Sequence, residues 1–259
     1  MTIRRSLSIA ALAGIALPAL PLAQGGGGQP PKNLQVLPKD FTRQQVTQVM
    51  NSFTAALGVR CEHCHAADPN AAPPAPGGRG GGPPLDFPAD TKEEKKIARE
   101  MLKMVMDINN KYLPLTGRTI GDRDKVNCET CHHGLVRPMT LRAALAGAVE
   151  AKGADSATAL YRDLRTRYYG SAAYDFSENS LTRAAGELAQ ANQRPAALAL
   201  LKLNLEFFEK SAPTYQSIAQ ISLATGDTTA AVAALKKAIE LQPNNPQLQN
   251  MLQRLAPKP

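Results

Sequence analysis

Tryptophan is absent from the sequence and other aromatic residues are few, which limits how its core can pack. Phe, Tyr and Trp make up 5% of the 259 residues, whereas hydrophobic residues together reach 43%. Much of the packing must therefore come from Ala, Leu and Val, as in closely packed helices of small residues. The composition predicts a mostly α-helical globular protein of one large or two ordinary domains.

Cysteine is equally scarce, and its few copies occur in two C-x-x-C pairs, Cys61 with Cys64 and Cys128 with Cys131. No cysteine remains for a structural disulfide elsewhere. The 64 positions from Cys64 to Cys128 are too many for the short spacers of a zinc ribbon or finger. Two redox disulfides are an alternative, but they do not explain why a histidine follows both pairs.

Long apolar runs are missing after the first 24 residues. Residues 1–24 have two early arginines and an apolar run from Leu7 to Leu22, the layout of a secretory signal peptide. An uncleaved anchor is the alternative, but Pro18 and Pro21 favour cleavage. No later stretch approaches the ~20 apolar residues of a membrane span. We therefore expect a periplasmic or extracellular protein with no membrane span after signal cleavage.

The net charge of +8 falls to +6 when the two arginines of the signal segment are removed. This excess suits acidic redox partners, but it also fits an ordinary solvated surface. The sequence contains no basic stripe with interleaved aromatic residues, the pattern that would indicate nucleic-acid binding.

Two segments read C-x-x-C-H, from Cys61 to His65 and from Cys128 to His132. Thiols at this spacing add across the two vinyl groups of one porphyrin, and the adjacent imidazole ligates the iron. Four Cys and four His among 259 residues would give such a motif by chance about once per thousand chains. We predict two covalently attached haem c groups, bound through Cys61, Cys64, Cys128 and Cys131, with His65 and His132 as proximal iron ligands.

The segment from Asp40 to Gly58 is expected to be a helix that leads into the first motif. Thr42 and Gln45 predict a capping box, and Gly58 is a typical helix end. An apolar stripe contains Val46, Val49, Met50, Phe53 and Leu57. A methionine on such a stripe is usually a core residue. Because a haem must lie close by, Met50 is instead predicted to be its distal ligand.

A second helix is expected from Thr91, boxed by Glu94, to Pro114. At 100° per residue, Ile97, Met101, Met104, Val105 and Ile108 share one face and Met106 lies opposite. Met101 and Met104 are both candidate ligands of the second haem, and the spacing does not choose between them. The Gly- and Pro-rich residues 66–90 are predicted to be a surface connection, and residues 113–127 a polar loop.

Two further histidines, His63 and His133, lie within or beside the motifs. Steric constraints keep them from the distal side of the same iron, although either could ligate a haem of a neighbouring subunit. With all four histidines at the motifs, no acid–base constellation for a haem peroxidase is evident, and that enzyme class remains only an alternative.

Several segments within residues 33–139 share a pattern with a known family. They are the Met50 helix before CEHCH, the run KKIAREMLKM at 95–104, Ile108-Asn109, and CETCHHG from Cys128. Together they resemble the cytochrome c subunit family of photosynthetic reaction centres. The resemblance implies units of helix, turn and C-x-x-C-H in which a helix methionine is the sixth iron ligand. It implies Met50 for the first haem and Met101 for the second.

The chain also departs from that family. It has two motifs where the family usually carries four haems, and no histidine lies between Met104 and Cys128. The longer loop before Cys128 keeps Met104 open as an alternative ligand. The resemblance therefore implies fold and haem ligation, not photosynthesis.

After Met139 the sequence is rich in Ala and Leu and predicts helix pairs. Placing Pro243 at the closing proline of a 34-residue tetratricopeptide repeat puts Tyr215, Ala219, Ala231, Leu235 and Ala238 at its signature sites. Stepping back 34 positions gives Ala185, Ala197 and Leu201 as equivalents, and a third, looser pair spans 140–169. Stacked pairs of this kind either bind proteins on a concave surface or simply stabilise the chain.

We therefore predict an all-α protein: a signal peptide (1–24), a dihaem c-type cytochrome domain with few strands (25–139) and an α-solenoid of tetratricopeptide-like helix pairs (140–259). Its expected function is one-electron transfer with redox protein partners, not catalysis. An alternative is a self-assembling filament subunit, in which the repeats join successive cytochromes as a homo-oligomer.

Overall fold

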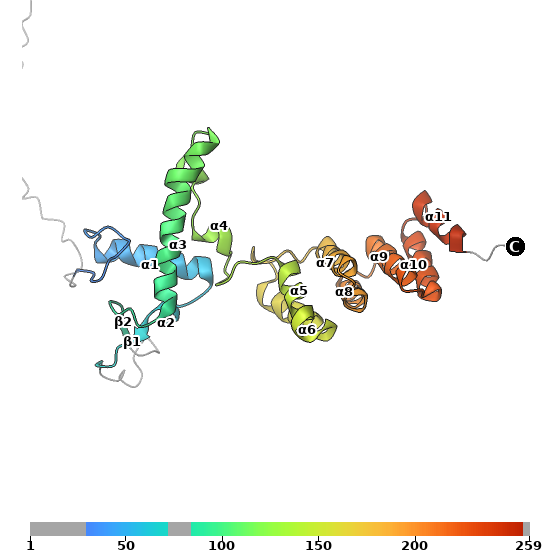
Figure 1. Cartoon of the computed structure of the whole chain (residues 1–259), viewed down its shortest axis with the longest axis horizontal. Coiled ribbons are helices and arrows are strands. Elements are labelled where there is room, and N and C mark those ends of the chain that lie inside the picture. The colour runs from blue at the N-terminus through green and yellow to red at the C-terminus, as the bar shows by residue number, and fades with distance from the viewer. Residues whose placement is uncertain (1–29, 72–83, 256–259) are drawn as a thin grey trace, which may run out of the picture.

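The computed structural model describes residues 30–71 and 84–255 and is mostly helical, which confirms the predicted fold class (Figure 1). The predicted signal segment, residues 1–24, lies outside the described residues. The strands found are β1 (Ala66–Ala67) and β2 (Leu85–Asp86), an antiparallel pair with Ala66 opposite Asp86. None of the described helices combines the length and apolar character needed to cross a bilayer.

The first helix, α1 (Arg43–Leu57), begins and ends as the sequence predicts. Thr42 and Gln45 form the capping box, and Gly58 ends the helix in the left-handed conformation with φ of 65°. Glycine adopts this conformation without the steric penalty that other residues meet. The chain then turns directly into α2 (Cys61–Cys64), the first motif.

The second long helix, α3 (Glu93–Asp107), starts later than predicted and lacks the expected Thr91–Glu94 capping box. Lys92 occupies the N-cap position, and its Nζ donates to the main-chain oxygens of Glu62 and His63. This lysine fastens the start of α3 to the first motif, so the cap that the sequence predicted is replaced by a tertiary contact.

The predicted stop at Pro114 is also wrong in detail. The helical path continues from α3 through a π-helical turn (Ile108–Tyr112) and a 3-10 turn (Leu113–Thr116) to Gly117. Pro114 is tolerated because the first turn of a helical segment needs no N–H donor. A further 3-10 turn (Asp122–Asp124) precedes α4 (Cys128–His132), the second motif.

The C-terminal half consists of packed helix pairs (Figure 1). The pairs are α5 (Leu141–Lys152) with α6 (Ala154–Tyr168), α7 (Glu178–Gln190) with α8 (Arg194–Phe207), and α9 (Ala212–Ala224) with α10 (Thr228–Leu241), followed by α11 (Pro246–Leu255). The predicted signature positions Ala219, Ala231, Leu235 and Ala238 are fully buried. Their counterparts 34 residues earlier, Ala185, Ala197 and Leu201, are fully buried as well.

The two halves differ sharply in how much apolar surface they bury. The helix pairs contain a large cluster of buried Leu and Ala side chains around Tyr161 and a smaller one around Leu235. Among the described residues up to 140, the buried apolar side chains are Ala56 and Leu135 alone. The N-terminal half therefore has almost no protein core of its own in the part that the structure describes.

Candidate functional site

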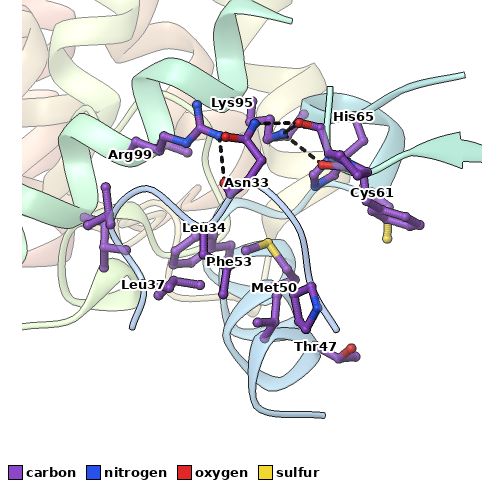
Figure 2. Close-up of a pocket in the computed structure, with 18 of the residues that line it drawn as sticks. Asn33, Leu34, Leu37, Thr47, Met50, Phe53, Cys61, His65, Lys95 and Arg99 are labelled. Carbon is purple, nitrogen blue, oxygen red and sulfur yellow. Dashed lines mark hydrogen bonds between the residues drawn. The ribbon is translucent and has the colours of Figure 1, made fainter. Parts of the chain in front are cut away.

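The residues predicted around the first haem line one cavity of about 480 Å³ between α1, α2 and α3. Met50 contributes from α1, Cys61 and Cys64 from α2, and His65 from the position after it. Figure 2 shows Met50 and Phe53 on the α1 side of the cavity, and His65 and Lys95 across from them. The volume lies within the range of about 300–1,000 Å³ usual for cofactor pockets.

Apolar side chains from three segments form most of the cavity wall. They come from the start of the described chain, from α1 and from α3, and include Leu34, Leu37, Val46, Phe53, Leu57 and Leu102. The α1 members share one face because they are three or four residues apart. Two free thiols, an imidazole and a thioether around one apolar cavity are the groups that a covalently attached haem requires.

His65 is the most buried polar residue among those described before residue 141, at 9% exposed. Its Nδ1 atom is buried without a hydrogen-bond partner, and the Phe87 ring packs edge-on against it with centroids 4.9 Å apart. Burial, followed by the charge of Lys95, lowers the pKa of His65, so the neutral, metal-binding form is favoured. The unpartnered nitrogen sets His65 apart from an ordinary core histidine, whose buried polar atoms are hydrogen-bonded.

A charged cluster closes one side of this cavity. Asp90 pairs with Lys95 at 2.9 Å and with Arg99 at 2.8 Å, and both basic residues line the cavity from α3. Hydrogen bonds from Arg99, Asn33 and Lys95 hold the pKa of the Asp90 carboxyl far below its usual range. Lys95 also donates to the main-chain oxygen of Phe87 at 2.8 Å, which fixes the segment that touches His65.

The sequence interpretation missed Phe87 and Asp90 because both lie in the segment 66–90 that it treated only as a connection. Residues 72–83 of that segment lie outside the described residues. Its end is structured, since Leu85–Asp86 pairs with Ala66–Ala67 and places Phe87 against His65. The apolar and acidic residues after Pro84 were the available signal.

None of the four cysteines is paired in a disulfide. Burial raises the pKa of Cys64 and of Cys128. A thiol–disulfide oxidoreductase would need the opposite, a lowered pKa that favours the thiolate. Within residues 30–71 and 84–255, no three or more His, Cys, Asp and Glu side chains gather as a metal site, so the two pairs do not converge on one zinc ion there.

The second motif is held by local hydrogen bonds. Asn127 and Thr130 form a capping box at the start of α4. Just before it, the side chain of Asn109 accepts from the N–H of Val126 and donates to its carbonyl oxygen, each at 2.8 Å. These contacts connect the π-helical turn after α3 to the residues that precede Cys128.

His132 has the hydrogen bond expected of a metal-binding imidazole. Its Nδ1 lies 2.7 Å from the carbonyl oxygen of Leu135. A ring whose Nδ1–H donates to the main chain leaves Nε2 free to bind a metal. The two motifs thus differ, because Nδ1 of His65 has no such partner.

A smaller cavity of about 260 Å³ lies beside the second motif. Its wall combines Cys131, His132 and His133 with the loop residues Ala172–Asp175 between α6 and α7. His133 is exposed and adopts a left-handed conformation with φ of 48°. His63 lines neither cavity and is half-buried.

Met101 and Met104 lie on a different face of α3 from the first cavity. The cavity is lined by Lys95, Ala98, Arg99 and Leu102. At 100° per residue, the face of Ile97, Met101 and Met104 is turned roughly 140° away from the face that lines the cavity. Ile97 is 51% exposed, Met101 43% and Met104 46%, and Met106 is equally exposed at 45%. Helix α3 therefore contributes one face to the first cavity and leaves a second apolar face open.

Comparisons with known proteins find a repeat family and two cytochromes c. Residues 212–245 match the tetratricopeptide repeat family, which confirms the predicted repeat that ends after Pro243. A photosynthetic reaction center cytochrome c subunit of Rubrivivax gelatinosus is 28% identical over 104 residues, 35% of this chain and 23% of that protein. Cytochrome c-554 of Chloroflexus aurantiacus is 29% identical over 101 residues, 39% of this chain and 20% of that protein. The matches thus span about a fifth of the length of these curated relatives.

Proposed function

We propose that this chain is an exported dihaem c-type cytochrome whose function is one-electron transfer. The observation that carries the proposal is the first cavity, where Met50, Cys61, Cys64 and His65 surround one apolar space. The similarity to two cytochromes c, each covering part of the chain, supports the same function.

The residues of the first cavity have distinct proposed roles. Cys61 and Cys64 form the thioether bonds, His65 is the proximal ligand and Met50 the distal ligand of the iron. Haem c supplies one-electron redox chemistry when it is bound. A methionine in the sixth position keeps that position closed to substrates, which favours electron transfer over peroxidase chemistry.

The shortage of protein core in the N-terminal half supports bound haem independently. Among the described residues up to 140, two apolar side chains are buried, too few to stabilise a domain of this length. Large apolar groups attached at residues 61–65 and 128–132 would fill this deficit. Folding of this half is then coupled to cofactor attachment, as in other small metal-binding domains.

For the second haem we propose Cys128 and Cys131 as attachment residues and His132 as proximal ligand. The hydrogen bond from His132 Nδ1 to Leu135 supports this role. Met101 remains the favoured distal ligand and Met104 the alternative. Neither methionine lines the smaller cavity beside the second motif, so this choice of ligand rests on the sequence pattern and on the exposed apolar face of α3.

The helical repeats are proposed to bind protein partners. A tetratricopeptide repeat at 212–245 and the stacked helix pairs before it support an extended protein-binding surface. The smaller cavity places the second motif next to the α6–α7 loop. A redox partner held by the repeats would therefore approach the second haem first.

Serine substitution of each cysteine pair tests the proposal. When the wild-type protein is exported in a host that attaches haem c, its intact mass is expected to exceed that of the polypeptide by two haems. The variants C61S/C64S and C128S/C131S should each lose one. Retention of both haems in either variant, or a wild type without covalent haem, would contradict the proposal.

A further inference from the structure

The two motifs meet at a contact between two glycines. Gly58 ends α1, and Gly134 follows His132 by two residues. The N–H of Gly134 donates to the carbonyl oxygen of Ala56 at 2.8 Å, and Ala56 is 3% exposed. A Cβ atom on Gly58 would lie 2.5 Å from the carbonyl oxygen of Gly134, closer than real side chains approach. Glycine is therefore required at position 58 for this packing as well as for its positive φ.

The segment that Gly58 touches is the one that orients the second histidine. Residues 132–135 form a tight turn in which the N–H of Leu135 donates to the carbonyl oxygen of His132 at 2.8 Å. The carbonyl oxygen of Leu135 in turn accepts from Nδ1 of His132 at 2.7 Å. Leu135 is buried, so this turn has little room to move. Displacement of the Gly134 oxygen would therefore disturb the hydrogen bond that holds the imidazole.

We infer that Gly58 is a positioning residue for the second haem, although it lies three residues before Cys61 and belongs to the first helix-to-motif unit. The inference rests on the proposed dihaem function. A hydrogen bond from Nδ1 fixes the ring and raises the donor strength of the imidazole toward iron. Losing it weakens stabilisation of the oxidised iron, so the reduction potential of the second haem rises.

The test compares Gly58→Ala with Gly117→Ala in the full-length haem-loaded protein. Gly117 is a matched control because its φ of 70° is close to the 65° of Gly58, while no described atom lies within 4 Å of its added Cβ. Both variants therefore share the backbone strain, and only Gly58→Ala has the clash. The potentials of the two haems are followed by NMR during a redox titration, with each haem assigned through its thioether-linked cysteines.

For Gly58→Ala we expect an upward shift in the potential of the second haem that exceeds any shift of the first. Gly117→Ala should leave the reduction potentials of both haems close to the wild-type values. A shift confined to the first haem, equal shifts of both, no shift, or the same shift in the control would overturn the inference. Intact mass is recorded for every sample, so a wild type with two haems separates this outcome from failure of the proposed function.

If Gly58→Ala does not fold and acquire its haems, a measurement on the wild-type protein tests the same contact. In the reduced protein, the Gly134 amide should exchange slowly with solvent, because it is bonded to a buried carbonyl. Exchange as fast as that of exposed loop amides would show that the contact does not persist and would overturn the inference.

Discussion

Individual residues of the first site make the sharpest predictions because they line one cavity. Replacing Met50 by Ala removes the proposed thioether ligand. Methionine ligation raises the reduction potential of a haem. In Met50→Ala the reduction potential of the first haem should therefore fall by on the order of 0.1 V, within the ~0.8 V range that axial ligands set. Absorption spectra and a redox titration measure the effect. Met106→Ala is the control, since this exposed methionine lines neither cavity.

An unchanged spectrum and potential in Met50→Ala would remove Met50 from the ligand set. The roles of Cys61 and Cys64 in attachment and of His65 as proximal ligand would still stand, because thioether formation depends on the motif itself.

The second distal ligand is decided by two parallel substitutions. Met101→Leu and Met104→Leu keep the apolar volume of the α3 face and remove only the sulfur. We expect Met101→Leu to change the spectrum of the second haem and Met104→Leu to leave it as in the wild type. The reverse result would assign Met104, and no change in either would exclude both. Solvent exposure does not distinguish the two candidate ligands, since Met101 is 43% and Met104 46% exposed.

Asn109 connects the π-helical turn after α3 to Val126, just before the second motif. Asn109→Ala loses two hydrogen bonds to Val126, with an expected cost of about 1–3 kcal/mol in the free energy of unfolding of the N-terminal half. Chemical denaturation followed by haem absorbance measures it. Asn110→Ala, at the exposed neighbouring position, should cost less than about 0.5 kcal/mol. Equal losses of unfolding free energy in the two variants would contradict the proposed role of the Asn109 hydrogen bonds.

Elements with strong local signals were predictable from the sequence. The Thr42–Gln45 box and Gly58 define α1 through contacts between near neighbours, and the 34-residue period identifies the repeat at 212–245. The start of α3 was not predictable, because Lys92 is held by carbonyl groups thirty residues away in sequence. Phe87 and Asp90 were missed because residues 66–90 have the composition of a simple connection, while their partners His65 and Arg99 belong to other elements.

At the scale of the whole molecule, the two halves should respond differently to the loss of haem. A chain with all four cysteines replaced by Ser retains the buried Leu and Ala clusters of the helix pairs, but the described residues before 141 offer little core. We expect amide protons of α1, α3 and α4 to exchange rapidly in this variant, while those of α7 to α10 stay protected. Hydrogen exchange with mass spectrometry checks this. Strong protection of α1 and α3 without haem would contradict the proposed structural role of the cofactor.

The presence of two covalent haems is measured by a pyridine haemochrome spectrum of the mature protein, combined with its intact mass. We expect a c-type spectrum with two haems per chain and a mass that includes both as covalent additions. A protein that matures without covalent haem, or that carries a noncovalent cofactor instead, would contradict this expectation.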